Sequence, residues 1–218
     1  MKSGLVRPIT DEGLPEWIAP LVSDREPNPP LGYVVCFLSF LDWGFGTPAS
    51  RLIREILHYY GVDLHNLNPN SVMQAVVFAT VCEGFLEVPP HWNLWLHLFK
   101  ADMSTRYEGG EKIPLWVGGC TLQLRQTRSR EYIWSAMPTS NRGWQSGWFY
   151  LQNDGGLLSG YTRKMVVECP AKWAWGAPVE EQKRFGPLLA GLEKLCQARV
   201  TATTVVTAFH KRSLLPLA

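Results

Sequence analysis

Hydrophobic positions recur with the period of an α-helix in the first half of the chain, and the clearest stretch follows Pro48. Apolar residues fall every three or four positions up to Tyr60, so they share one helix face. Thr47 is placed to cap this helix, with Pro48 at the first helical position, where its missing N–H costs nothing. Gly61 suits the left-handed residue that ends a helix. The pattern therefore predicts a helix over about 48–60.

Two further helices are predicted downstream. The pair Asn68–Pro69 repeats the start signal, and residues 70–86 are apolar nearly all round, which predicts a central, buried helix. Asn93 is placed to cap a short third helix that carries leucine, tryptophan and phenylalanine side chains. Together these patterns predict an N-terminal lobe of three packed helices.

The segment before these helices is harder to interpret. Residues 31–45 are almost wholly apolar and therefore buried, but period alone does not separate strand from helix there. We favour a short strand that leads into a helical turn ending at Gly44. Residues 1–30 are rich in proline and acidic side chains, which predicts a flexible segment.

The second half of the chain has a different texture. Short runs with aromatic or alternating residues at 118–125, 130–137 and 147–154 are separated by polar, glycine-containing segments. Such runs are typical of an antiparallel β-meander. Two amphipathic helices are expected to close the chain, one from Pro187 and one after Thr201.

These elements predict an α+β fold that is mainly helical, with an N-terminal three-helix lobe, a small antiparallel β-meander and two C-terminal helices. The predicted parts are the flexible segment 1–30, the helical lobe 31–104, and the meander with the C-terminal helices over 105–218. Tryptophans occur on both sides of the last boundary. We therefore expect the lobe and the C-terminal part to form one cooperative domain.

Charge is distributed unevenly along the chain. Residues 1–99 carry 5 Lys and Arg against 10 Asp and Glu, whereas residues 100–172 carry 10 against 6 and residues 173–218 carry 6 against 3. An acidic front and a basic back are compatible with head-to-tail self-association or with a polyanion on the back. The alternative is that these charges are simply scattered over solvated surfaces.

The cysteines and the N-terminus indicate the compartment. The five cysteines are odd in number and widely spaced, which argues against a disulfide framework and for a reducing environment. The N-terminus lacks the apolar core of a signal peptide, and no apolar stretch is long enough to span a bilayer. We expect an intracellular protein, in the nucleus or the cytoplasm, with no membrane partner.

Motifs for catalysis, metal binding or cofactor binding are not recognisable. The cysteines and histidines lack the spacing of a zinc site, and GGEK at 109–112 lacks the features of a phosphate-binding loop. A three-carboxylate nuclease needs acids that emerge from a central sheet, and Glu131 and Asp154 lie near the loops of the predicted sheet. Three acids can be chosen from any such chain, here from Asp42, Asp63, Glu83, Glu87, Asp102, Glu111, Glu131, Asp154 and Glu168, so their spacing carries no argument. We expect no catalytic residue, no metal ligand, no cofactor and no small-molecule ligand.

One group of residues is compatible with nucleic-acid binding. Arg125, Arg128 and Arg130 follow a predicted strand, and Arg142 and Lys164 lie further along, near several aromatic residues. Arginines beside aromatic side chains can hold a phosphate backbone and stack bases. The alternative is that the aromatic residues belong to the core and the arginines lie over strand ends.

Five ordered blocks of the chain resemble a known family. They read GYVVCFLSFLDWGFGTPASRLIREILHYYGVDLHNLNPNSV, VCEGFLEVPPHWNLWLHLF, GGCTLQLR, SNRGWQSGWFYLQND and VVTAFHKRSLLPL. From about residue 15 to the C-terminus, the chain resembles the plant family named "putative gypsy-type transposon", described as a transposase or a gag-like protein of gypsy-type retrotransposons. This family has no established catalytic residues, so the resemblance implies none here.

The resemblance implies a protein derived from a transposable element. We expect a non-enzymatic, gag-like structural or interaction module of a gypsy-type retrotransposon, which self-associates or binds RNA or DNA. The alternatives are a transposase-like nuclease and a degenerate copy of the element with no present activity. Longer family members continue past the position of Leu217 into charged, coiled-coil-like sequence, so the resemblance leaves open whether this chain is a trimmed copy of a longer element protein.

Overall fold

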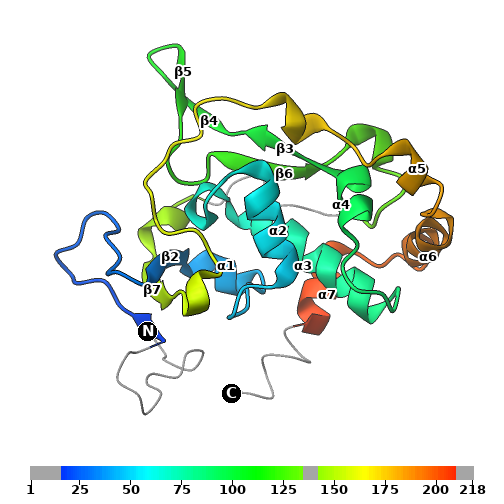
Figure 1. The fold of residues 1–218 in the computed structure, drawn as a ribbon, viewed down its shortest axis with the longest axis horizontal. Helices are drawn as coiled ribbons and strands as arrows, with labels where there is room; N and C mark the ends of the chain where they lie inside the picture. The colour runs from blue at the N-terminus through cyan, green and yellow to red at the C-terminus, as the bar shows by residue number, and fades with distance from the viewer. Residues whose placement is uncertain (1–15, 135–141, 210–218) are drawn as a thin grey trace.

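The computed structural model describes residues 16–134 and 142–209, which pack around one hydrophobic core (Figure 1). The α-helices are α1 (Leu38–Asp42), α2 (Arg51–Tyr60), α3 (Pro69–Gly84), α4 (Trp92–Leu98), α5 (Val179–Gln182), α6 (Gly186–Gln197) and α7 (Ala202–Phe209). The strands are β1 (Trp17–Ile18), β2 (Tyr33–Phe37), β3 (Phe99–Met103), β4 (Thr105–Glu108), β5 (Glu111–Pro114), β6 (Cys120–Leu124) and β7 (Trp148–Gln152). The short 3-10 helices include η1 (Leu64–Asn66) and η5 (Ala171–Ala174).

The strands of the described residues form three small antiparallel sheets. β7 lies between β1 and β2, with Tyr150 opposite Val35 in the β2 pairing. β3 pairs with β6, with Ala101 opposite Leu122. β4 and β5 form a hairpin that projects from the body of the molecule at the upper left of Figure 1. The first two sheets therefore each join the N-terminal and C-terminal halves of the chain.

The predicted arrangement of elements is wrong, although the fold is mixed α+β. In the described residues, four α-helices (α1–α4) stand where the sequence predicts three, and three (α5–α7) stand where it predicts two. The predicted meander is not formed, because β6 pairs with β3 and β7 pairs with β1 and β2. Of the second predicted strand, residues 130–134 contain only an isolated bridge at Trp134, and residues 135–137 lie outside the described part. Alternation identifies which face of a strand is buried but not which strand lies beside it.

The apolar segment 31–45 contains both a strand and a helix, in the favoured order. β2 is buried along its whole length between β7 and the helices, and α1 follows it directly. Gly44 then adopts a φ of +86°, a left-handed value that favours glycine, and the chain turns there towards α2. The favoured interpretation is confirmed.

The helix predicted from Pro48 begins later than its sequence signal. α2 starts at Arg51, and the side chain of Ser50 caps it by accepting a hydrogen bond from the N–H of Ile53 at 3.3 Å. Thr47 lies before the helix and is exposed. Gly61 ends the helix in a left-handed conformation, as predicted.

α4 also uses a different cap from the predicted Asn93. The Nδ1 atom of His91 accepts a hydrogen bond from the N–H of Leu94 at 3.2 Å, so the helix begins at Trp92. The predicted start of α3 is confirmed, with Asn68 as the cap and proline at the first helical position.

α3 is the central helix of the core and is buried on most sides. Its Phe78 ring packs edge-on against Trp95 of α4 and Phe99 of β3, with ring centroids 5.4 and 5.9 Å away. Trp95 and Phe99 in turn stack at 4.2 Å. These aromatic contacts join α3, α4 and the β3–β6 sheet. In the described part of the chain, no helix combines the length and the hydrophobicity that crossing a bilayer requires.

Candidate functional site

The candidate site depends on η1, whose polar side chains are buried. Asn66 is 1% exposed and makes three hydrogen bonds. Its Oδ1 accepts from the N–H of Asp63 at 2.9 Å, and its Nδ2 donates to the carbonyl oxygens of Trp116 at 3.2 Å and Lys164 at 2.8 Å. Asn66 therefore fixes two backbone segments that lie about 50 and 98 positions away in the sequence.

The polar residues after η1 connect α3 to the β3–β6 sheet. Asn68 caps α3 and also donates from Nδ2 to Oγ1 of Thr121 at 2.8 Å. Ser71 is fully buried, and its Oγ accepts a hydrogen bond from the N–H of Leu122 at 2.8 Å. The motif DLHNLNPNS at 63–71 thus uses its polar atoms to hold the fold together, which explains its composition without any catalytic role.

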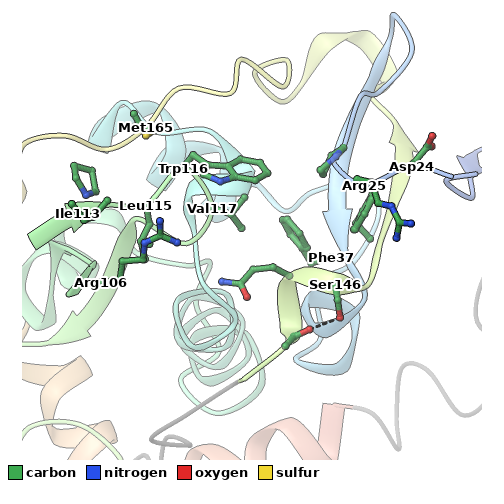
Figure 2. Close-up of a pocket in the computed structure, with 15 residues that line it drawn as sticks. Asp24, Arg25, Phe37, Arg106, Ile113, Leu115, Trp116, Val117, Ser146 and Met165 are labelled. Atoms are coloured by element: carbon green, nitrogen blue, oxygen red, sulfur yellow. Dashed lines mark hydrogen bonds between the residues drawn. The ribbon is translucent and has the colours of Figure 1, made fainter. Parts of the chain in front are cut away.

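A groove of about 750 Å³ lies between the β4–β5 hairpin and the β1–β7–β2 sheet. Figure 2 shows Arg106 and Leu115 on one side, Phe37 and Arg25 on the other, and Trp116 between them. The volume falls within the range of ligand-binding pockets. The groove is lined by Asp24, Arg25, Pro27, Phe37, Arg106, Ile113, Pro114, Leu115, Trp116, Val117, Gly143, Gln145, Ser146, Trp148 and Met165.

Two glycines allow the chain beside the groove to pack closely. Gly118 has a φ of +72°, and a Cβ atom there would lie 2.8 Å from a ring carbon of Trp144. A Cβ atom on Gly119 would lie 2.4 Å from the carbonyl oxygen of Leu115. Any larger residue would push these segments apart, so the glycine pair is required for the shape of this region.

The groove carries both positive and negative side chains. Arg106 is 63% exposed and pairs with Glu108 of the same strand at 2.9 Å. Asp24 accepts a hydrogen bond from the N–H of Leu21 at 2.9 Å, while Arg25 beside it is exposed. Surface ion pairs of this kind are weak, so Arg106 can exchange Glu108 for an anionic ligand at little cost.

The arginines predicted to bind nucleic acid after β6 are largely engaged within the fold. The guanidinium of Arg125 donates to the carbonyl oxygens of Leu96, Ala174 and Trp175, at 3.1, 3.0 and 2.7 Å. It therefore holds the η5 segment against α4 and β6. Arg128 pairs with Glu131 at 2.7 Å.

Arg130, the third residue of this predicted cluster, is exposed. Lys164 and Arg142 lie elsewhere, and both are exposed as well. Lys164 precedes the groove residue Met165, and Arg142 precedes the groove residue Gly143. The five predicted residues thus fall into two groups, and Arg142 and Lys164 lie next to the groove.

The carboxylates singled out in the sequence have separate structural partners. Glu131 accepts hydrogen bonds from Arg128 at 2.7 Å and from the buried His97 at 2.8 Å. Burial alone would raise the pKa of Glu131, but these hydrogen bonds outweigh it and lower the pKa below its ordinary value. Asp102 contacts Lys100 at 3.2 Å, and Asp63 caps η1. Within residues 16–134 and 142–209, no three His, Cys, Asp or Glu side chains gather as they would around a metal ion.

Sequence reasoning missed the groove because its main residues come from segments with no recognised role. Arg25 lies in the segment assigned to a flexible tail, and Arg106 lies in the β4–β5 hairpin, which the sequence analysis did not identify. The pair Gly109–Gly110 between strand-forming residues is a hairpin signal that identifies this element. The position of Trp116 follows from the hydrogen bond to Asn66, which no local pattern reveals.

The class defined by this geometry is a mixed α+β module with an open arginine- and tryptophan-lined groove. A family model described as "Putative gypsy type transposon" matches residues 35–103, from β2 to the end of β3. The predicted family resemblance is confirmed over this segment, which contains η1 and its polar motif. No curated protein and no solved structure matches the chain. The family's description names a kind of mobile element and specifies no reaction.

Proposed function

We propose that this chain is a non-enzymatic, gag-like interaction module of a gypsy-type element. The observation that carries this proposal is the groove, which is open, carries arginines and is shaped by the polar motif of the segment that matches the family. Its lining contains arginine and tryptophan, two residue types that are enriched at the centres of binding interfaces.

The carboxylates support the same proposal. A three-carboxylate nuclease holds two metal ions with acids that converge on one place. Here Glu131 is hydrogen-bonded to Arg128 and His97, while Asp63 belongs to the cap of η1. Their partners are those of structural residues.

The test combines association and cleavage. The purified chain is run on size exclusion with light scattering at low and high salt, with and without single-stranded RNA, and is separately incubated with RNA and DNA in Mg²⁺ or Mn²⁺. We expect a concentration-dependent oligomer or a salt-sensitive RNA complex, with the nucleic acid left intact. Metal-dependent cleavage that a single carboxylate substitution abolishes would overturn the proposal. A chain that stays monomeric at all concentrations and ignores RNA and DNA would do so as well.

A further inference from the structure

Several basic residues line the groove, contact a lining residue or precede one in the sequence. In the described part of the chain, they are Arg25, Arg106, Arg142, Arg163 and Lys164. Arg163 belongs to this set because its Nη2 donates to the carbonyl oxygen of the groove residue Pro27 at 3.1 Å. Among the described residues that line the groove, the charged ones are Arg25, Arg106 and Asp24, so the lining carries an excess of positive charge. An anionic chain fits this distribution.

The aromatic residues of the groove differ in how they can be used. Phe37 is only 1% exposed and packs against Trp144 with ring centroids 4.8 Å apart, so it belongs to the core. Trp116 and Trp148 are partly exposed and line the groove itself. Figure 2 shows the Trp116 ring projecting over the space between Arg106 and Phe37. A tryptophan face beside arginines is a surface on which a nucleic-acid base stacks.

We infer that this groove binds single-stranded nucleic acid, with Arg25 and Arg106 contacting phosphates and Trp116 stacking on a base. This inference rests on the proposed function and specifies its partner. Only a base that has left a duplex stack exposes its face to a tryptophan, so the ligand is a single strand. An acidic peptide offers a planar ring only where it contains an aromatic residue, whereas every nucleotide carries a base beside its phosphate, and the groove therefore suits a nucleic acid better.

The inference assigns the site to a different surface from Arg125, Arg128 and Arg130. Arg125 donates hydrogen bonds to three carbonyl oxygens, and Arg128 pairs with Glu131. These two guanidinium groups therefore have few N–H donors left to bind a phosphate. Arg106 is exposed and pairs with the exposed Glu108. Charge that is already hydrogen-bonded inside the fold releases few counterions when a nucleic acid binds.

The test measures fluorescence anisotropy of a labelled short oligouridylate over a series of salt concentrations. Arg25→Ala and Arg106→Ala should each weaken binding several-fold and reduce the slope of log K against log salt by about 0.7, the value for one lost phosphate contact on a single strand. Trp116→Leu should weaken binding by about five-fold or more and leave the salt slope unchanged, because stacking involves no counterion. Glu108→Gln should tighten binding, since it frees Arg106.

Arg130→Ala is the matched control, because it removes the same charge from an exposed position outside the groove. It should change binding less than two-fold, and each variant must keep the cooperative unfolding midpoint of the parent. Equal losses from Arg130→Ala and Arg106→Ala, or no loss from any groove variant, would overturn the inference.

Two further outcomes separate the inference from the proposed function. A chain that self-associates but does not bind oligouridylate would overturn the inference and leave the proposed function standing. Binding of polyglutamate without oligouridylate would assign the groove to a protein ligand, and would also overturn the inference. Failure of both association and binding would remove the proposed function as well.

Discussion

Replacing Asn66 with alanine should destabilise this protein by about 3 kcal/mol, because one buried side chain makes three hydrogen bonds. The side chain is 1% exposed, and its partners are the N–H of Asp63 and the carbonyl oxygens of Trp116 and Lys164. Each hydrogen bond is worth about 1 kcal/mol net, and a buried group left without a partner costs about 1–3 kcal/mol. Water can reach the exposed segment at Lys164, which keeps the expected total near the sum of the three net values.

A second variant tests the acceptor atom of the Asn66 side chain, Oδ1, separately from its donor atom, Nδ2. Asn66→Asp keeps an oxygen for the N–H of Asp63 but places a carboxylate against the carbonyl oxygens of Trp116 and Lys164. Near neutral pH this variant should be at least as unstable as Asn66→Ala, because a buried charge faces two acceptors. Protonation supplies one donor, so its deficit should shrink as the pH falls towards 4.

Urea unfolding followed by tryptophan fluorescence measures the free energy of unfolding of both variants. An unchanged dependence of that free energy on urea concentration shows that the same transition is being compared. For a chain of 218 residues, about 3 kcal/mol corresponds to a fall in Tm of roughly 6–12 °C. Asn28→Ala is the control, because Asn28 is exposed and uses its backbone N–H to contact Tyr150. A loss below about 1 kcal/mol for Asn66→Ala would refute the role assigned to η1.

Three further predictions follow from individual contacts. Ser50→Ala should lower the free energy of unfolding by about 1 kcal/mol in urea and Thr47→Ala by less than about 0.5 kcal/mol, because Ser50 caps α2. The reverse order would show that Thr47 is the cap, as the sequence predicts. Glu131→Gln should cost about 1–2 kcal/mol at pH 7. Because the pKa of Glu131 is lowered in the folded protein, its ionised carboxylate stabilises the fold above the ordinary glutamate pKa, and this stabilisation disappears as the pH falls through the folded pKa. The stability curves of the parent and of Glu131→Gln should therefore converge below about pH 4, and a constant gap between them would contradict this. Arg125→Lys should speed hydrogen exchange of the backbone in η5, because an ammonium cannot span three carbonyl oxygens; unchanged exchange would show that Arg125 does not hold this segment.

The parts of the fold that sequence predicts are those determined by neighbours in the chain. The start of α3 follows from Asn68 and the proline after it, and the end of α2 follows from Gly61. The burial of 31–45 also follows from local pattern, since an unbroken apolar run must be buried, although its period does not separate strand from helix. In each case the deciding hydrogen bond or backbone angle lies within a few residues.

The pairing of strands was not predictable in this way. β6 finds its partner in β3, just before the hairpin, whereas β7 pairs with β1 and β2 at the other end of the chain. Strands of five residues or fewer contain too few side chains to specify a partner by pattern alone. The choice is made by tertiary contacts such as the hydrogen bond from the N–H of Leu122 to Ser71.

The residues of the candidate site were not predicted from sequence, for a related reason. Charged residues were selected because they stand near aromatic residues in the sequence, but Arg125 and Arg128 are used inside the fold, while Arg25 and Arg106 face the groove. A guanidinium has the same composition in either role. Arg125 is distinguished by its three backbone acceptors, which lie 29, 49 and 50 positions away in the sequence.

The same argument determines how binding experiments on this protein must be interpreted. Asn66 holds the backbone of Trp116, which lines the groove, and of Lys164, which adjoins it, without lining the groove itself. Asn66→Ala should therefore weaken nucleic-acid binding by displacing Trp116, while it leaves the salt slope unchanged because no phosphate contact is lost. Arg106→Ala should do the opposite, changing the slope with little effect on stability. Stability and salt slope measured together thus distinguish a residue that shapes the groove from one that contacts the ligand.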